Sequence, residues 1–219
     1  MRTPRAIAAA LIGLLACGPV LAQEVGATLS QQGTDNRALI DQTGAADGSG
    51  TSIEQIGASN YAEAIDAGAG NLLDIEQEGE GQQAEVRLDG SQNDGTLSQY
   101  GAANTAILAI GGARNSFRVL QGRAGDPALA NTIELSQEGA DNFAFQRQFG
   151  TGNAMSLVQQ GDANAAGMLQ VGSDNAMALT QSGDGLGATL EQYGNAAAPI
   201  SVIQTGVGTS ISITHVGAQ

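Results

Sequence analysis

An eleven-residue repeat runs through most of the chain and limits what it can fold into. Each unit is anchored on a residue, most often glutamine, that stands two places before a glycine in sixteen of seventeen units, as Gln181 and Gly183 do in NAMALTQSG; Arg123 is the exception. Seventeen units follow one another between Leu29 and Gly217, and thirteen of the sixteen spacings are eleven residues. The three longer spacings contain AADGSG, GRAGDPALA and NAAAP, where turn-forming residues cluster. A repeat this short cannot bury an apolar face alone, so neighbouring units must stack.

Each unit is predicted to be a short β-strand followed by a tight turn. Side chains of a strand alternate between two faces, so the anchor shares a face with the positions two and four places before it. These positions hold mainly aliphatic residues, small residues and glutamine, whereas charged residues such as Arg37, Glu54 and Glu85 occupy the positions between them or the turns. One face of each strand therefore points inward and the other contacts solvent.

Two units placed face to face make a coil of 22 residues, and such coils stack. Every second anchor behaves as one column, since Gln55, Gln77 and Gln99 are alike while Asp66 and Leu88 stand between them. The sequence therefore predicts an all-β protein, a β-solenoid of stacked 22-residue coils with two facing parallel sheets. Seventeen units make about eight coils, and a strand spacing of about 4.8 Å gives a body roughly 40 Å long.

Stacking explains why amide side chains recur at inward positions. An unpaired buried polar group costs about 1–3 kcal/mol, but identical amides in successive coils can hydrogen-bond along the stack. We expect stacking from Gln31, Asn36, Gln42, Gln55, Asn60, Asn71, Gln77, Asn93, Gln99, Asn104, Asn115, Gln121, Gln137, Asn142, Gln148, Asn153, Gln159, Asn164, Gln170, Asn175, Gln181, Gln192 and Gln204. Glycine adopts turn dihedral angles that other residues resist. We expect this role for Gly33, Gly57, Gly79, Gly101, Gly139, Gly161 and Gly183.

Composition and charge exclude several other classes of protein. The chain has 219 residues with no tryptophan and 3% aromatic residues, which is too few for a globular core of large side chains. Its apolar content of 42% is too high for a charged disordered chain. The formal net charge is −14, and near −16 without the first 22 residues, so the surface repels nucleic acid and anionic lipid. We therefore expect no nucleic-acid partner.

The first 22 residues have the pattern of a secretory signal peptide. Arg2 and Arg5 precede an apolar stretch, and the small residues of VLA end at Ala22 before Gln23. We therefore expect a signal peptide at residues 1–22 and the solenoid at residues 23–219. The only cysteine, Cys17, stands in LLAC, which also resembles a lipoprotein cleavage box, so lipidation stays an open alternative. Cleavage after Ala22 would leave a mature chain without thiol chemistry.

The units resemble curlin repeats, with their Gln-x-Gly-x-x-Asn-x-Ala core. LSQQGTDNRA, IEQIGASNYA and LSQYGAANTA show this core, and the resemblance covers Leu29 to about Gly217. It implies a secreted subunit that assembles head to tail into extracellular amyloid (curli) fibres, or pili, on the surface of a Gram-negative bacterium. Such fibres serve cell adhesion and the biofilm matrix. The resemblance also implies three partners, namely copies of the chain itself, a second curlin subunit and an outer-membrane curli secretion system. It does not decide between the major and the minor, nucleating subunit.

The chain departs from familiar curlins in its length and at its N-terminus. It has more than eight full repeats where familiar curlins have about five. Major subunits carry a glycine-rich targeting segment before the repeats, whereas only residues 23–28 precede them here, so the export route stays open. The insertion at 122–131 marks a candidate break at which the solenoid would divide into two stacks.

Two further features of the repeats do not follow the common pattern. Asp66 takes an inward anchor position, where it is either a brake on ladder formation or a solvated defect. Phe143, Phe145 and Phe149 take outward positions, where they form either a lateral contact or a patch that protects an edge.

Other functions receive less support from the residues. The single histidine, His215, stands at an anchor, and the carboxylates follow the outward pattern of a solvated face, so we expect no enzyme, cofactor, metal site or small-molecule substrate. A calcium-binding solenoid would need Asp at a fixed place in a nine-residue repeat. The remaining alternative is a monomeric secreted β-solenoid, an adhesin or a ligand-binding protein, that does not polymerise. An ice-binding solenoid would show a regular outward row of one residue type, and the outward positions here are mixed.

Overall fold

A computed structural model of the chain describes residues 25–125 and 129–217. The expected signal peptide and Cys17 lie outside these residues. Within them the chain forms seventeen β-strands and no helix. Accordingly, the described part of the chain offers no helix that is long and apolar enough to cross a membrane.

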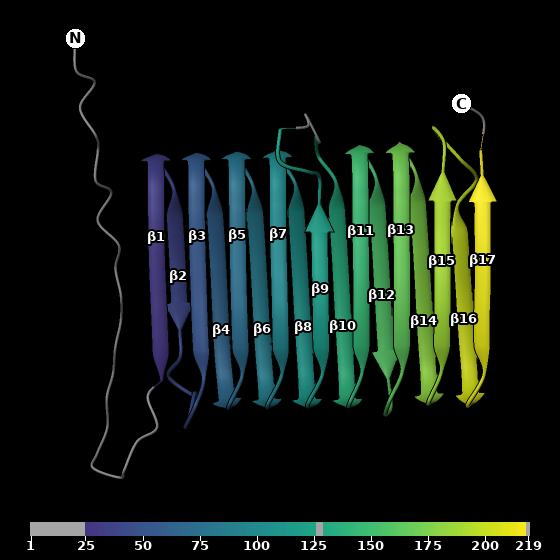
Figure 1. Cartoon of the computed structure of the whole chain (residues 1–219), viewed down its shortest axis with the longest axis horizontal. Helices are drawn as coiled ribbons and strands as arrows, with labels where there is room; N and C mark the ends of the chain where they lie inside the picture. The colour runs from purple at the N-terminus through teal and green to yellow at the C-terminus, as the bar shows by residue number, and fades with distance from the viewer. Residues whose placement is uncertain (1–24, 126–128, 218–219) are drawn as a thin grey trace.

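The strands alternate along the chain between two parallel sheets, which face each other (Figure 1). The nine odd-numbered strands form sheet A. They are β1 (Gly26–Thr34), β3 (Gly50–Ala58), β5 (Leu72–Glu80), β7 (Asp94–Ala102), β9 (Ser116–Gln121), β11 (Phe143–Thr151), β13 (Ala165–Ser173), β15 (Gly187–Tyr193) and β17 (Ser210–Val216). The eight even-numbered strands form sheet B. They are β2 (Arg37–Asp41), β4 (Tyr61–Ala69), β6 (Gln83–Ser91), β8 (Thr105–Ala113), β10 (Thr132–Ala140), β12 (Ala154–Gln160), β14 (Ala176–Asp184) and β16 (Ile200–Val207).

Neighbouring strands keep the repeat in register. In sheet A, Gln31 lies opposite Gln55 and Gly33 opposite Gly57, and sheet B aligns its own units in the same way. The predicted β-solenoid of two facing parallel sheets is therefore confirmed. Because sheet A has nine strands and sheet B eight, the solenoid has about nine coils, slightly more than the period alone suggested.

The chain reverses direction in two steps at the end of each strand. Strand β3 continues through Gly57 to Ala58, and only Ser59 and Asn60 separate it from β4. Gly57 has φ 121° and Ser59 has φ 57°, so the chain bends at the glycine and turns two residues later. The expected turn glycine thus lies inside the strand, because pairing with the neighbouring coil continues through it.

The insertions form loops at the corners of the coils and leave both sheets continuous. On either side of residues 122–131, β10 pairs with β8 and β11 pairs with β9. Leu129 even bridges to Ala102 and Thr151 of the coils before and after it. The chain is therefore one stack, and the candidate break at 122–131 does not divide it.

The apolar core lies between the two sheets. Aliphatic side chains two places before the anchors point inward and are fully or almost fully buried, among them Ile53, Ile75 and Leu97 of sheet A and Val86 and Leu108 of sheet B. Outward side chains alternate with them along every strand, as the burial pattern of β6 shows. The core is thus a thin slab of small and medium side chains that runs the length of the solenoid.

Candidate functional site

A column of glutamines runs along the inside of sheet A. Each side chain donates from Nε2 to Oε1 of the glutamine in the next coil, over Gln31, Gln55, Gln77, Gln99, Gln121, Gln148, Gln170 and Gln192. The Nε2–Oε1 distances are 2.6 to 3.3 Å, and from Gln55 onward every member is fully buried. The column is therefore a continuous hydrogen-bonded ladder with one direction, in which Gln31 donates to Gln55 and its own Oε1 accepts no hydrogen bond from the described residues.

The second N–H of these amides is used as well. Nε2 of Gln77 also donates to the backbone oxygen of Tyr61 at 2.9 Å, and Nε2 of Gln99 donates to that of Gln83 at 3.0 Å. Each of these carbonyls belongs to the first residue of a strand in sheet B. The ladder thus also ties the corner of one coil to the opposite sheet, which explains how an amide can stay fully buried.

The equivalent column in sheet B is a ladder over only half of its length. Gln137, Gln159, Gln181 and Gln204 are joined by Nε2–Oε1 hydrogen bonds of 2.8 to 3.0 Å. The preceding anchors of this sheet are Asp66, Leu88 and Ile110, all buried. Gln42, which we expected in this column, instead donates to the backbone oxygen of Gly26 and to Oγ1 of Thr51, both at 3.2 Å.

Asparagines form two further columns, one at each edge of the sheets. Oδ1 of each accepts the backbone N–H of the residue one coil further on, as Asn36 accepts from Asn60 at 3.0 Å. Nδ2 donates to the carbonyl oxygen of a glycine in the next coil, as Asn60 does to Gly79 at 3.1 Å. The structure places all the predicted asparagines in these columns, namely Asn36, Asn60, Asn71, Asn93, Asn104, Asn115, Asn142, Asn153, Asn164 and Asn175. Their main partners are backbone groups, so each asparagine pins a turn of one coil to the turn of the next.

Three members of these columns were missed by the sequence analysis. Gln82 and Asn131 complete the column that contains Asn104, and Ser49 begins the column that contains Asn71. Gln82 stands five places after an anchor, so the same spacing could have found it. Asn131 and Ser49 follow insertions, where counting forward from the preceding anchor fails. Counting back six places from the next anchor recovers both.

Asp66 is a carboxyl group inside the sheet B column. Its side chain is 1% exposed, Oδ1 accepts from Nδ2 of Asn71 at 2.7 Å, and Oδ2 is buried without a hydrogen-bond partner. Burial raises the pKa of this carboxyl group above its usual value, and the hydrogen bond from Asn71 only partly opposes that effect. Asp66 is thus a buried defect, and the solvated alternative that we considered is wrong.

Gln146 is a second polar defect, which the repeat pattern did not reveal. It occupies a position two places before an anchor, where other units hold an aliphatic residue. The side chain is fully buried, and neither Nε2 nor Oε1 has a hydrogen-bond partner. An unmatched amide of this kind weakens the middle of the stack.

The predicted turn glycines form columns in which no side chain fits. Gly33, Gly57, Gly79, Gly101, Gly139, Gly161 and Gly183 all have φ between 101° and 138°. A Cβ atom added at Gly57 would lie 1.9 Å from the backbone oxygen of Gly79 in the next coil. Close approach of successive turns therefore requires glycine at these positions other than Gly101, where the positive φ favours it.

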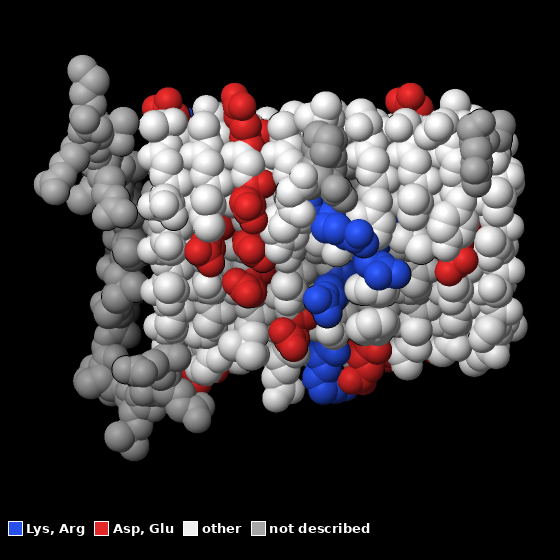
Figure 2. All heavy atoms as spheres, turned by 45° about the horizontal axis from the view of Figure 1, so that its top comes forward, with Lys and Arg blue, Asp and Glu red and all other residues white. Residues whose placement is uncertain are grey.

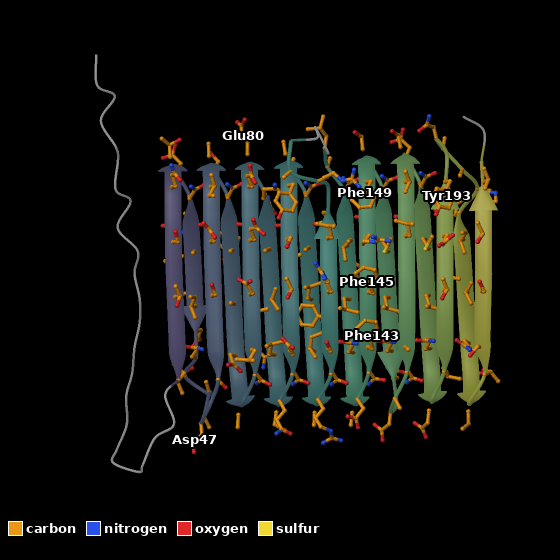
Figure 3. The ribbon with its side chains drawn as sticks, viewed as in Figure 1. Asp47, Glu80, Phe143, Phe145, Phe149 and Tyr193 are labelled. Atoms are coloured by element: carbon orange, nitrogen blue, oxygen red, sulfur yellow. The ribbon has the colours of Figure 1, made fainter. Side chains whose placement is uncertain are left out.

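The outer face of sheet A carries a group of phenylalanines with arginines beside them. Phe143, Phe145 and Phe149 project from β11 (Figure 3), and Phe143 is 47% exposed. The guanidinium carbon of Arg147 lies 4.9 Å from the centre of the Phe145 ring, and basic side chains gather near the middle of the body, beside acidic ones (Figure 2). Arginines thus partly cover the phenylalanines that we expected as an apolar patch.

The two ends of the stack differ from its middle. Inward apolar side chains are buried throughout the body, but Leu29, Ala38 and Ile40 at one end and Val202 and Ile213 at the other are only partly buried. No further coil covers them within the described residues, and the outer edges of β1, β2, β16 and β17 pair with no other strand. Both ends therefore present unpaired backbone groups beside uncovered apolar side chains.

Two segments of the chain, residues 46–79 and 150–183, match the model of the curlin associated repeat family. The first segment covers β3, β4 and most of β5, and the second runs from the end of β11 through β12 and β13 into β14; both include glutamine, asparagine and glycine members of the columns described above. The search of curated proteins found no match to the chain. Curlin repeats and the β-solenoid that they form are structural, and they provide a scaffold for stacking.

Proposed function

Because this chain carries curlin repeats, we propose that it is a fibre subunit that assembles head to tail through the two ends of its solenoid. The observation that carries the proposal is the state of those ends, where strand edges and inward apolar residues are uncovered. Proteins that stay monomeric usually protect such edges with charges, bulges, prolines or covering segments. Addition of the next copy would extend both sheets and bury Leu29 and Ile40 as their counterparts in the body are buried.

The fibre that results would be a cross-β filament whose strands lie across its axis. A head-to-tail contact does not close on itself, so it produces an open filament. Curlin-repeat proteins act at the cell surface, which supports a role in extracellular fibres for adhesion and the biofilm matrix. The signal-peptide pattern of residues 1–22 supports secretion. On the same basis we propose a second curlin subunit and an outer-membrane curli secretion system as partners.

The experiment that tests this proposal follows dye binding by purified protein diluted from denaturant. We expect fibres that bind amyloid dyes after a lag, and we expect that preformed fibre fragments remove the lag. Protein that stays monomeric for days at high concentration, without a dye response, would contradict the proposal and favour the monomeric adhesin.

A pair of variants tests whether the ends carry the assembly. Leu29→Asp places a charge on the inward face of β1, where the next copy would cover it, whereas Ser30→Asp places the same charge on the exposed outward face. We expect Leu29→Asp to remain soluble and folded and to lose seeded growth at this end, because an unpaired charge would be buried on docking. Ser30→Asp should form fibres like the parent protein. Equal assembly by both variants would show that this end is not a docking surface.

A further inference from the structure

The residues that the structure describes form seventeen strands, an odd number, which affects how one copy can follow another. Both the first described strand, β1, and the last, β17, belong to sheet A, so sheet A has nine strands and sheet B eight. Figure 1 shows β1 and β17 as the outermost strands of the body, with β2 and β16 set back from them. Each end therefore has a step, in which sheet A projects beyond sheet B.

Two orientations of the next copy bring strand edges together at this step. If the next copy is only shifted along the axis, its β1 follows β17 in sheet A. Its β2 then lies one strand too far from β16, because sheet B lacks the strand that would face β17. This orientation leaves a gap one strand wide in sheet B, with unpaired backbone groups on both sides of the gap and no cover for Val202.

A half-turn of the next copy about the long axis removes this gap. Its projecting β1 then fills the recess beside β16, and the recess beside its own β2 receives β17. The strands of sheet A and sheet B run in opposite directions in Figure 1, and a half-turn exchanges the sheets and reverses the strand direction. The strands that meet are therefore parallel, as in every strand pair within the chain.

The side chains that meet after a half-turn continue the columns of the body. In the register of the repeat, Gln204 of β16 lies opposite Gln31 of the next β1, and Val202 lies opposite Leu29. Gln31 is the acceptor end of the sheet A ladder, and no donor to its Oε1 is found among the described residues. Gln204 is the last glutamine of sheet B, and its Nε2 donates to the backbone oxygen of Gly187 and, in the absence of another glutamine, to the backbone oxygen and Oγ1 of Thr209. The junction therefore joins a glutamine donor to a glutamine acceptor.

The second half of the junction pairs two polar atoms that the single chain leaves unpaired. His215 of β17 lies opposite Gln42 of the next β2 in the register of the repeat. Nδ1 of His215 and Oε1 of Gln42 are both buried without a hydrogen-bond partner in the described part of the chain, and the two residues stand at opposite ends of the solenoid. A neutral imidazole with its proton on Nδ1 is a donor that matches the amide oxygen. A simple shift would place His215 opposite Gln31 and leave Gln42 beside the gap.

We propose that successive copies of this chain in the fibre are related by a half-turn about the fibre axis, so that β16 and β17 of one copy pair with β1 and β2 of the next. This inference rests on the proposed fibre function and adds the orientation of the subunits. The structural repeat along the fibre is then two copies, and each sheet of the fibre consists of sheet A and sheet B in alternation.

Disulfide trapping between outward positions distinguishes the two orientations. Parallel neighbouring strands lie about 4.8 Å apart, within the Cα–Cα range of about 4.4–6.8 Å that a disulfide spans. In a Cys17→Ser background, Ser30→Cys with Ile203→Cys reports the half-turn, and Ser30→Cys with Thr214→Cys reports the simple shift. All three positions are exposed and outward, and each stands one place before an anchor. Ser30→Cys with Glu54→Cys, which lie opposite each other in β1 and β3, is the intramolecular control for reactivity.

We expect oxidised fibres of the Ser30/Ile203 variant to yield covalent dimers and longer chains on a denaturing gel, and the Ser30/Thr214 fibres to yield monomers. Dimers from the Ser30/Thr214 variant alone would overturn the half-turn. Fibres that yield no covalent dimers from either variant, while the control pair oxidises, would also overturn it and would leave fibre formation itself supported. Absence of fibres from the parent protein under seeded conditions would instead contradict the proposed function, and the half-turn with it.

Discussion

Each buried glutamine depends on the amides directly before and after it. Within the sheet A ladder an amide accepts one hydrogen bond, donates a second to the next glutamine and, at several positions, donates a third to a backbone oxygen. Loss of one member therefore leaves partners unpaired on both sides. In sheet B the anchors Leu88 and Ile110 follow each other, so apolar residues there contact apolar residues. The positions of a column can thus be amides or apolar residues, provided that residues of the same kind follow each other over several successive coils.

For one substitution, the dependence of each amide on its neighbours predicts a loss of stability where side-chain hydrophobicity alone would predict a gain. Gln99→Leu makes the core more apolar but leaves Nε2 of Gln77, Oε1 of Gln121 and the backbone oxygen of Gln83 without their partner. We expect a loss of unfolding free energy of about 2–4 kcal/mol, since each unsatisfied buried group costs about 1–3 kcal/mol and the site partly relaxes. Urea unfolding followed by circular dichroism measures it.

The reverse substitution in the facing column is the matched control. Leu88→Gln introduces an amide between Asp66 and Ile110, where no ladder partner of the same kind exists. We expect this variant to be destabilised as well, although it exchanges the same two residue types in the other direction. Stabilisation by either substitution would contradict the dependence of each amide on its neighbours.

Asp66 makes the stability of the stack depend on pH. Its pKa is raised in the folded chain by burial, so the folded state binds the proton more tightly than the unfolded state does. Below the ordinary value of 3.8 both states hold the proton and Asp66 carries no penalty. As the pH rises from that value through the raised pKa, the unfolded state ionises first and the stability contributed by protonation is lost.

We therefore expect Asp66→Asn to stabilise the chain at neutral pH and to flatten part of its pH dependence. Asparagine keeps the shape of the side chain and removes the charge. The free energy of unfolding should differ most between the two proteins above the raised pKa and converge at the acid end, and urea unfolding from pH 3 to pH 8 measures this. Parallel curves for Asp66→Asn and the parent protein would show that the Asp66 carboxyl group does not titrate differently in the folded state.

At the scale of the element, the glycine near the end of each strand sets how closely coils can stack. Gly57→Ala would place Cβ 1.9 Å from the oxygen of Gly79, at a φ of 121° that alanine resists. We expect the local stack to open and the free energy of unfolding to fall by several kcal/mol, on the order of 3 kcal/mol by analogy with strained backbone positions. Thermal unfolding measures the loss.

Gly167→Ala is the control for the same change of residue. Gly167 lies in β13, and an added Cβ there meets no atom within 4 Å. We expect it to be neutral or slightly stabilising, because alanine lowers the entropy of the unfolded chain. Equal destabilisation by both substitutions would contradict the role of the glycine column.

Every repeat unit carries the residues that determine the strands, their facing arrangement and most of the columns. These features could therefore be predicted from the sequence. A period of eleven with alternating faces fixes which residues of a strand point inward, and Gln77 and Asn104 lie in hydrogen-bonded columns at the spacing it gives. The contacts of residues that deviate from the repeat were harder to predict from the sequence. Gln42 precedes an insertion, so its side chain meets Gly26 and Thr51 in place of a ladder partner, and Gln146 breaks the aliphatic pattern in a single unit. Such sites depend on contacts between coils that no single unit encodes.

At the scale of the molecule, the same repeat that stabilises the body makes its ends attractive to another copy. Every coil but the outermost ones has a neighbouring coil on both sides, so the ends differ from the middle only because one neighbouring coil is missing there. Because the number of strands is odd, sheet A projects at both ends, so the steps of successive copies fit after a half-turn, whereas an even number would place the projecting strands in different sheets, where a simple shift would fit. Growth would repeat the pairing of the interior, which explains how one sequence pattern can specify both the fold and the assembly.

Net charge opposes this assembly, and salt should therefore control its rate. The formal charge is −14 at pH 7, and the described acidic residues lie mainly on outward faces and in turns, so two copies repel each other before their ends meet. Raising sodium chloride from about 10 to 150 mM shortens the screening length from about 30 to 8 Å. We expect the lag before fibre growth to fall several-fold while the final fibre mass stays the same. Seeded growth should accelerate as well, since docking of each copy crosses the same repulsion, and dye fluorescence at fixed pH follows both phases. A lag that lengthens with salt would mean that attraction between opposite charges, such as the acidic and basic groups beside each other in Figure 2, steers the encounter instead.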